Sequence, residues 1–446
     1  MKYVFSGGIN ELNDIAMPVT EAVSGFNFEL GLGNTKFKPR KPFDLAGTAD
    51  NASRITGIMQ LVKRDNTFTT LVASGATMYS WDGTTFTSES AINSTSEFHG
   101  TYWSLDDVMA VVDRNKATPV KSWDGTTFSN LAHNISGVTS LYAKYGIVAN
   151  GRLVLANVKT DVTDNPHLIA FSEFENIENF DTATRGGDAG FTTGNEPFYL
   201  LTPDLKPINA LVYFQDVLVC STQDGQLFKL VGDDSTNYRW DNFYTGSAAI
   251  GTNSFVDVGN DLFYMREGGV IESLVSTDKF GDVGTDDISI KLRGTINNEE
   301  GMRAVYDQTN RKVFFFLQSK VLVLFKDMIN GQDSPFTVYT TQHPQGFNTN
   351  AATYLISPVT GERTVLFGDD NGNIYDMNGS GVGDAATYDI KVQRKMPLQD
   401  FNYDRFLEGR VFYRRIAAVD LGIIFNWGDE KNETGLILAL KAPTAV

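Results

Sequence analysis

The chain has one cysteine, Cys220, in 446 residues. A single thiol cannot form an internal disulfide, so the fold is not a disulfide-stapled scaffold. Cys220 lies within the apolar run VLVCS, and this setting favours a buried structural thiol over a reactive nucleophile. The scarcity of cysteine also favours synthesis in a reducing cytoplasm.

Long hydrophobic segments are absent as well. No apolar run approaches the ~18 residues that a membrane-spanning helix needs. The N-terminal stretch MKYVFSGGINELND lacks the apolar core of a signal peptide. We therefore expect no membrane span and no secretion by that route.

Residues for metal and acid–base chemistry are sparse. The four histidines are scattered, with neither an HExxH motif nor an i, i+4 pair: His99, His133, His167 and His343. This pattern gives no indication of a zinc site. The GxSxG, GxxxxGK[ST] and strand-linked GxGxxG signatures are also missing. We expect no enzyme and no cofactor.

Two acidic segments each allow a functional and a purely structural interpretation. Glu173, Glu175 and Glu178 in SEFENIENFD could supply a carboxylate pair for glycoside hydrolysis, but a solvated acidic loop is the favoured interpretation. In GDDNGNIYD, oxygen-bearing side chains alternate as in calcium loops: Asp369, Asn371, Asn373 and Asp376. A plain Asn-Gly hairpin explains that segment better, and a calcium ion there stays an open alternative.

Basic residues are fewer than acidic residues. The chain has 37 Lys and Arg against 54 Asp and Glu, a formal net charge of −17. This balance argues against a protein that binds nucleic acid tightly, since such affinity comes from contacts of Lys and Arg with phosphates. An acidic surface keeps a protein soluble, and it could also let a polyanion slide past. Candidate acidic channel positions are Asp233, Asp234, Asp369 and Asp370, for which ordinary turn chemistry is the alternative.

The string WDGTTF occurs at Trp81–Phe86 and again 42 residues later at Trp123–Phe128. An interval of ~40–45 residues is the length of one four-stranded propeller blade. Asp-Gly predicts a two-residue hairpin turn between strands. Looser copies of this hairpin are found at Asp224–Phe228, Glu267–Ile271 and Asn371–Tyr375.

Seven short apolar runs, each bounded by turn residues, support a propeller. They are Leu71–Ala73, Val108–Val112, Leu153–Ala156, Val217–Cys220, Leu262–Met265, Val313–Leu317 and Val365–Phe367. The sequence predicts an all-β fold with a β-propeller of six or seven blades, and seven runs favour seven. We divide the chain into an N-terminal arm with a closing strand (1–50), the propeller (51–385) and a small C-terminal strand-rich module (386–446), which could itself hold a blade-closing strand.

Four segments carry a resemblance to a known family. The opening FSGGINELNDIAMPVTEAVSGFNFEL, with Gly7, Gly8 and Pro18, is similar to the start of many tailed-phage virion proteins. MYSWDGTTF, SEFENIENF and the segment Gly251–Leu274 are similar to phage tail propellers. Together these segments resemble the propeller-bearing tail nozzle, or packaged-DNA stabilisation protein, of short-tailed bacteriophages.

The resemblance implies a structural protein of the virion tail, made in the bacterial host cytoplasm. It implies an oligomeric ring, usually of six copies, below the portal and adaptor, which carries fibres or a needle. Such a nozzle continues the DNA conduit, retains the packaged double-stranded DNA and permits its ejection without binding it specifically. The family has no site motif to transfer to these residues.

The main alternative is a sugar-binding or sialidase-like hydrolase propeller. SWDGTTF is loosely similar to the Asp-box S-x-D-x-G-x-T-W, but Asp82 and Gly83 are adjacent and the last aromatic is Phe86. A sialidase also needs an arginine cluster, for which Arg266, Arg293 and Arg303 are available. A WD or kelch scaffold is a further alternative, although Trp81-Asp82 lacks the Gly-His partner of the WD repeat. Another structural propeller of a phage, such as a hub or fibre-attachment subunit, also stays open.

Overall fold

The computed structural model describes most of the propeller and short parts of the two ends. The described residues are 8–9, 21–22, 24–26, 28–30, 37–40, 43–182, 195–246, 248–259, 261–266, 269–276, 283–292, 296, 303–317, 320–329, 335–340, 351–378, 391–393, 422–425 and 436–439. The chain forms two compact units, Met1–Lys395 and Met396–Val446.

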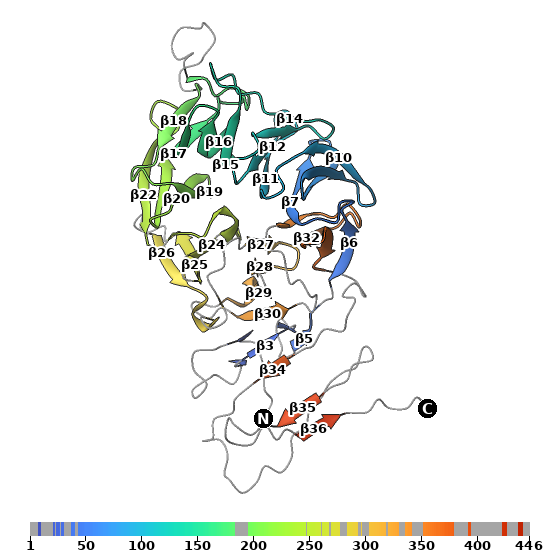
Figure 1. Ribbon diagram of the computed structural model, residues 1–446. Helices are drawn as coiled ribbons and strands as arrows, with labels where there is room; N and C mark the ends of the chain where they lie inside the picture. Colours follow the sequence, from blue (N-terminus) through green and yellow to red (C-terminus); the bar gives the residue numbers. More distant parts are fainter. Residues whose placement is uncertain are drawn as a thin grey trace. The chain divides into compact units, whose positions relative to one another are not determined.

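Seven four-stranded antiparallel sheets make up the first unit within these residues, and they are the blades of a β-propeller. The prediction of an all-β propeller of six or seven blades is confirmed, with seven. In Figure 1 the blades follow one another in chain order around a centre, with first strands such as β11 and β15 inside and fourth strands such as β10 and β14 outside.

The strand bounds of the blades are as follows. Blade 1 comprises β7 (Ile55–Val62), β8 (Phe68–Ser74), β9 (Thr77–Trp81) and β10 (Phe86–Ala91), and blade 2 comprises β11 (Phe98–Trp103), β12 (Val108–Asp113), β13 (Lys121–Trp123) and β14 (Phe128–Asn130). Blade 3 comprises β15 (Leu141–Ala149), β16 (Arg152–Thr160), β17 (Asp164–Phe171) and β18 (Phe198–Leu201), and blade 4 comprises β19 (Ile208–Phe214), β20 (Val217–Thr222), β21 (Gln226–Val231) and β22 (Arg239–Thr245). Blade 5 comprises β23 (Phe255–Asp257), β24 (Leu262–Arg266), β25 (Val270–Ser276) and β26 (Val283–Asp287), and blade 6 comprises β27 (Arg303–Asp307), β28 (Lys312–Phe316), β29 (Lys320–Phe325) and β30 (Phe336–Thr340). Blade 7 comprises β31 (Ala352–Ile356), β32 (Arg363–Gly368), β33 (Asn373–Asp376) and β6 (Asp44–Thr48).

The fourth strand of blade 7 comes from the opposite end of the propeller sequence. β6 pairs antiparallel with β33, with Leu45 opposite Tyr375 and Gly47 opposite Ile374. Beyond the strand, the Ala49 amide donates to the Gly372 carbonyl oxygen at 2.8 Å. The chain therefore closes the propeller by a non-covalent clasp, and the residues just before blade 1 provide the closing strand.

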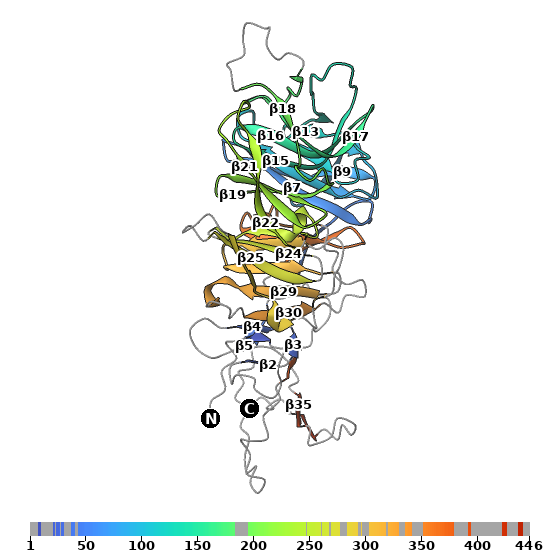
Figure 2. The ribbon, with the colours of Figure 1, turned by 90° about the vertical axis from the view of Figure 1, so that its left-hand side faces the viewer.

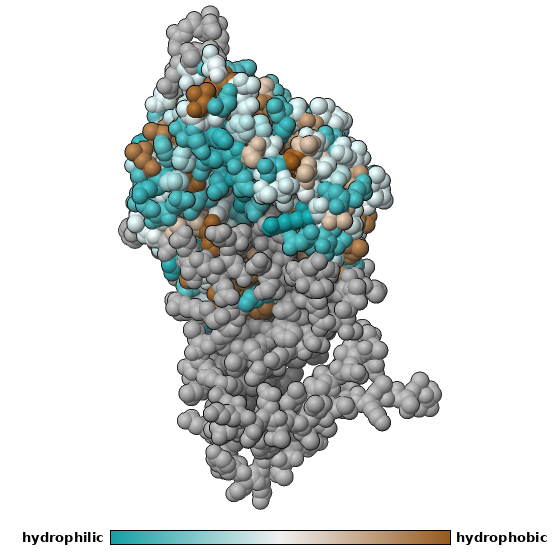
Figure 3. Space-filling model, in the orientation of Figure 1, coloured by the Kyte–Doolittle hydropathy of each residue, from teal (hydrophilic) through white to brown (hydrophobic). Residues whose placement is uncertain are grey.

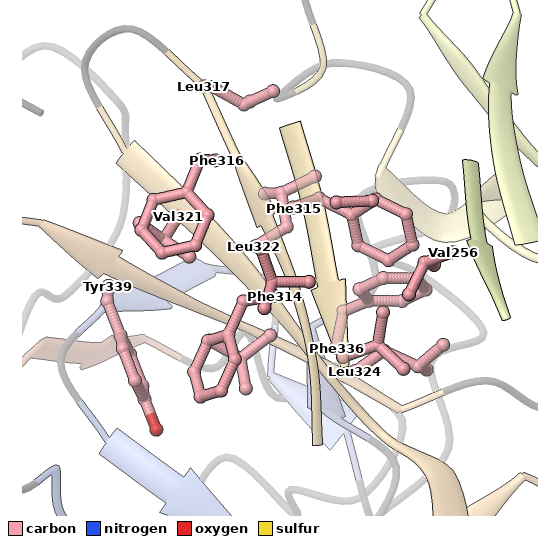
Figure 4. Packing of buried hydrophobic residues seen from close by; sticks show 14 of the residues in the cluster. Val256, Phe314, Phe315, Phe316, Leu317, Val321, Leu322, Leu324, Phe336 and Tyr339 are labelled. Carbon is pink, nitrogen blue, oxygen red and sulfur yellow. The ribbon is translucent and has the colours of Figure 1, made fainter. Parts of the chain in front are cut away.

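All seven apolar runs of the sequence form the second strands of the seven blades. A second strand has a paired strand on each side and a neighbouring blade on each face, so both of its faces are buried. In β28, Phe314, Phe315 and Phe316 are each at most 2% exposed. Figure 4 shows Phe315 pointing toward Val256 of blade 5, while Phe314 and Phe316 point the other way. Burial on both faces explains why these strands read as continuous apolar runs.

The hydrophobic core is a series of interfaces between neighbouring blades. One buried cluster combines Leu71 of blade 1 with Met109 of blade 2, and another combines Leu366 of blade 7 with Val72 of blade 1. The largest cluster spans blades 5, 6 and 7, and Figure 2 shows strands of blades 4, 5 and 6 as successive layers. Each fully buried aliphatic side chain contributes about 1.5–3 kcal/mol, so every blade depends on both of its neighbours.

The two WDGTTF copies occupy equivalent hairpins, between the third and fourth strands of blades 1 and 2. Gly83 and Gly125 have φ angles of 99° and 96°, as expected for turn glycines. The predicted two-residue turn is wrong, because Trp81 pairs with Phe86 and four residues connect the strands. The Asp82 carboxylate accepts from the Thr84 and Thr85 amides at 2.8 and 2.7 Å, so its side chain stabilises a longer loop.

The looser hairpin copies occupy a different place in their blades. Asp224–Phe228, Glu267–Ile271 and Asn371–Tyr375 connect second to third strands, in blades 4, 5 and 7. Treating them as copies of the WDGTTF hairpin was therefore wrong. A glycine turn fits either hairpin of a blade, since any tight reversal favours positive φ.

The N-terminal arm contributes further short strands. β1 (Gly8–Ile9) pairs with β2 (Glu21–Ala22), β3 (Ser24–Phe26) with β34 (Lys391–Gln393), and β4 (Phe28–Leu30) with β5 (Phe37–Pro39). Glu29 of β4 is 5% exposed and accepts from Lys312 Nζ at 2.5 Å and Tyr339 Oη at 3.0 Å. The arm is thus anchored to blade 6 by a buried ion pair.

The remaining elements are short. Three 3₁₀ turns are described: η2 (Thr252–Ser254), η3 (Ile290–Leu292) and η4 (Lys326–Met328). In the second unit, β35 (Gly422–Phe425) pairs antiparallel with β36 (Leu436–Ala439). Across the described ranges, no helix has the length and apolarity needed to cross a membrane.

Candidate functional site in the central channel

The first strands of the seven blades line a cavity of about 550 Å³ at the centre of the propeller. Its walls include apolar side chains such as Ile58, Phe98 and Leu211, together with His99, Asn253 and Arg303. The lining is about equally polar and apolar, the cavity is open to solvent, and its volume is in the range of small-molecule sites. Figure 3 shows the propeller face of Figure 1 as mainly hydrophilic, with hydrophobic residues scattered singly.

The polar groups of this cavity meet around Asn253. Asn253 lies in η2, immediately before the first strand of blade 5, and Arg303 is the first residue of β27. Arg303 donates through Nη2 to Asn253 Oδ1 at 3.0 Å and through Nη1 to the Ala352 carbonyl at 3.0 Å. Arg114, which follows β12, donates to the same Asn253 oxygen at 2.6 Å. One amide oxygen therefore accepts from two guanidinium groups that belong to different blades.

Positive charge exceeds negative charge here. Glu97 lies 3.6 Å from Arg114, and Asp257 lines the same cavity. Burial and the neighbouring Arg114 lower the pKa of Arg303 to about 9. Burial, followed by Arg114 and Lys116, lowers the pKa of Lys144 in β15. Burial is the larger cause of both shifts, and the neighbouring cations add to it because like charges disfavour the protonated form.

His99 of β11 lines the same cavity. Burial lowers its pKa to about 3, with Arg114 and Arg303 adding to the effect. The imidazole is therefore neutral near pH 7, with one donor and one acceptor nitrogen. We name the set formed by Arg114, Arg303, Asn253, His99 and Lys144 the channel cluster.

Three buried donors of the channel cluster have no hydrogen-bond partner among the described residues: Arg114 Nε, Arg303 Nε and Asn253 Nδ2. Arg303 is 6% exposed and Asn253 is 8% exposed. Buried polar groups are nearly always satisfied, so this concentration of donors requires an explanation. Among the described residues, no group of three His, Cys, Asp or Glu side chains could hold a metal ion.

The acidic positions proposed from the sequence lie in two turns. Asp369 is 2% exposed and accepts from the Asn371 and Asn373 amides, each at 2.8 Å. Its neighbour Asp370 is about half exposed and lies 3.4 Å from Arg54. The structure thus gives Asp369 the turn role rather than a position on an open surface.

Asp233 and Asp234 follow β21 and line a second hollow of about 510 Å³, with Arg152 and Phe174. Asp234 accepts from Thr236, and these hydrogen bonds lower its pKa. Arg152 is 2% exposed and donates to the carbonyl oxygens of Ser172 and Glu196 at 2.5 and 3.0 Å. Both acidic residues and the arginine therefore have local structural roles.

The other sequence candidates are not assembled into a site. Glu173 accepts from Asn176 and Asn179 within its own loop. Of the three arginines named for a sialidase-like site, Arg266 pairs with Glu272 at 2.6 Å, Arg303 belongs to the channel cluster and Arg293 lies outside the described residues. His343 also lies outside them. Sequence reasoning missed Arg114, Asn253 and Lys144, for which no local motif exists.

No family model and no curated protein matches this chain. Solved propellers match at low identity. The WD40 propeller domain of Doa1 is 9% identical over 75% of this chain and 97% of its own, with a TM-score of 0.46. YCF48 bound to D1 peptide is 10% identical over 75% and 95%, with a TM-score of 0.45.

The extracellular domain of a putative hybrid two-component system from B. thetaiotaomicron is 10% identical over 75% of this chain, with a TM-score of 0.49. The aligned part is 39% of that domain, so this chain spans about two fifths of its length. Such likeness concerns the propeller fold alone.

Proposed function

We propose that this chain is a structural protein of a short-tailed phage virion, the subunit of the tail nozzle. In this role several copies, six by the family resemblance, form an oligomeric ring below the portal and adaptor. The ring continues the DNA conduit, retains the packaged DNA and permits its ejection. It also carries fibres or a needle, and the subunit is made in the host cytoplasm before it joins the tail.

The observation that carries this proposal is where the family-like segments lie. MYSWDGTTF forms the β9–β10 hairpin of blade 1, and SEFENIENF connects β17 to β18 of blade 3. Gly251–Leu274 covers the first three strands of blade 5. Because these segments belong to three separate blades, the resemblance extends over the propeller and is not limited to one turn motif.

Two physical properties of the subunit fit a conduit wall. Each blade is packed against both neighbours and the clasp covers the edge of blade 7, which makes the propeller stiff and leaves its edges short. The net charge of −17 disfavours adhesion of a phosphate backbone. A head-to-tail interface between copies would close into a ring if its rotation permits.

Negative-stain electron microscopy tests this proposal directly. The purified full-length chain is imaged alone and after mixing with portal, adaptor and fibre proteins of a short-tailed phage. We expect closed rings, alone or on the adaptor, with a countable rotational symmetry. A chain that stays monomeric and joins no tail component under all these conditions contradicts the nozzle assignment.

A second measurement on the same preparation distinguishes a sugar-active propeller from a nozzle subunit. Hydrolysis of a fluorogenic sialoside, and retention on immobilised glycans, report that function without any assembly. We expect neither activity. Turnover of the sialoside that is lost in Arg303→Gln would favour the hydrolase over the nozzle.

A further inference from the structure

The channel cluster has more buried donors than acceptors. Asn253 Oδ1 already accepts from both arginines, while its Nδ2 group and the Nε groups of Arg114 and Arg303 have no described acceptor. Leaving a buried donor without a partner costs about 1–3 kcal/mol, and more for a charged group. Three such groups at one place leave the cluster short of acceptor oxygens.

The charges of the channel cluster also favour an anionic ligand. Arg114, Arg303 and Lys144 are three cations from three blades, against two carboxylates: Glu97, 3.6 Å from Arg114, and Asp257 in the cavity lining. Lys144 makes no ion pair with a described residue. In a chain with a net charge of −17 this local excess of positive charge is unusual. Its electrostatic cost falls if an anion binds.

The cavity limits the size of that anion. The first strands border a volume of about 550 Å³, which is the size of a site for a small molecule. We propose that the channel cluster binds one small oxyanion of the phosphate class, free or as a compact phosphate monoester. Arg303 and Asn253 both line the cavity and would face the anion there, and Arg114 and Lys144 supply further positive charge behind them.

Isothermal titration calorimetry of the full-length chain with inorganic phosphate tests the site. Sodium chloride keeps the ionic strength constant, so that general screening does not change. We expect saturable binding of one phosphate per chain. Sulfate and acetate titrations show whether a tetrahedral dianion is preferred over a carboxylate, and a small phosphate monoester shows whether a substituent fits. Absence of saturable binding for all four probes overturns the proposal.

Asn253→Asp distinguishes a binding site from a merely structural cluster. The substituted carboxylate keeps an acceptor for both arginines, replaces the unpartnered Nδ2 group and brings the missing negative charge. We expect loss of phosphate binding together with a melting temperature above that of the wild-type protein without phosphate. Unchanged phosphate affinity in this variant contradicts the proposal. Because the variant is expected to be more stable, misfolding does not confuse the result.

Arg303→Gln is the complementary variant, and we expect its phosphate affinity to fall by at least about tenfold. The matched control is Arg239→Gln, since Arg239 is an exposed arginine on the fourth strand of blade 4, paired with Asp241 at 3.4 Å. The control should bind phosphate as the wild-type protein does. Equal weakening in both arginine variants would identify the signal as non-specific charge attraction. The nozzle proposal is independent of this test.

Discussion

At the scale of single residues, adjacent side chains of one type have different roles. Asp369 is buried and its Oδ1 accepts from two backbone amides, while Oδ2 accepts from Asn373 Nδ2 at 2.8 Å. Asp370 is about half exposed beside Arg54. The sequence alone treats the two as one acidic pair, because nothing local indicates which of them turns inward.

This difference predicts unequal effects of the same substitution. Asp369→Asn places an amide NH₂ group against the Asn373 Nδ2 donor, so we expect a loss of about 1–3 kcal/mol in the free energy of unfolding. Asp370→Asn removes an exposed ion pair, and we expect a change within about 0.5 kcal/mol. Urea unfolding followed by tryptophan fluorescence measures both. Equal losses would contradict the assigned roles.

His99 predicts a specific sensitivity to acid. Its pKa is lowered to about 3 in the folded chain, first by burial and then by Arg114 and Arg303, against 6.5 for an unperturbed imidazole. Between these two pH values the unfolded chain takes up a proton that the folded chain does not. Stability is therefore lost as the pH falls from about 6.5 toward 3, by up to about 1.4 kcal/mol per pH unit from this group.

His99→Gln removes that contribution. We expect the unfolding free energy of the variant to decline less steeply than that of the wild-type protein below pH 6.5. Above pH 7 the two curves should run parallel, which serves as the internal control. The measurement is a series of urea unfolding curves in phosphate-free chloride buffers, so that no oxyanion compensates Arg114 and Arg303. Identical slopes below pH 6.5 would show that the imidazole is solvated.

At the scale of elements, continuous apolar runs predicted the positions of strands better than turn motifs did. The apolar runs at Val108–Val112 and Val313–Leu317 are both second strands, because only a strand buried on both faces needs a continuous apolar sequence. The turns were less informative. Gly83 and Gly225 both have positive φ, yet one lies in a third-to-fourth hairpin and the other in a second-to-third hairpin.

The clasp predicts that β6 can be covalently locked to β33. Leu45 and Tyr375 are register partners beside a bulge at Ala46, and facing Cα atoms of an antiparallel pair lie about 4.5–5.5 Å apart, within reach of a disulfide. We expect Leu45→Cys with Tyr375→Cys to form a bridge on oxidation. The oxidised form should be more stable than the reduced form by about 2–4 kcal/mol. Urea unfolding of the two forms measures the difference.

Two controls accompany this prediction. Leu45→Cys alone should respond to oxidant as the wild-type protein does, because the native Cys220 is fully buried. Thiol counting after oxidation reports whether the bridge has formed. If both introduced thiols stay free in the folded protein, the closing strand does not pair with β33.

At the scale of the whole molecule, the propeller brings together residues that the sequence separates. Arg114 and Asn253 are 139 positions apart, and Asn253 and Arg303 are 50 apart. They meet because the first strands of all blades converge on one axis. Such a cluster has no sequence motif, and Arg303 could be suspected from the sequence only as one member of a different arginine set. The acidic turns could be found, but their burial could not.

At this scale the charge of the molecule as a whole also differs from the charge of the channel cluster. The surface as a whole belongs to a chain with a net charge of −17, while the cationic channel cluster borders a cavity of about 550 Å³, which is too small for a duplex. We therefore expect negligible binding of double-stranded DNA at physiological salt, because few phosphate counterions would be released. Repulsion acts within roughly one Debye length of ~8 Å.

Fluorescence anisotropy of a labelled duplex, titrated with the purified chain at low and physiological salt, checks this expectation. Inorganic phosphate added at saturation should leave the anisotropy unchanged, because an anion in the channel does not compete with a duplex outside it. The Arg303→Gln variant should behave as the wild-type protein in this assay. Tight duplex binding that weakens steeply with salt would place a cationic face on the molecule. It would contradict a conduit wall that DNA passes without adhesion.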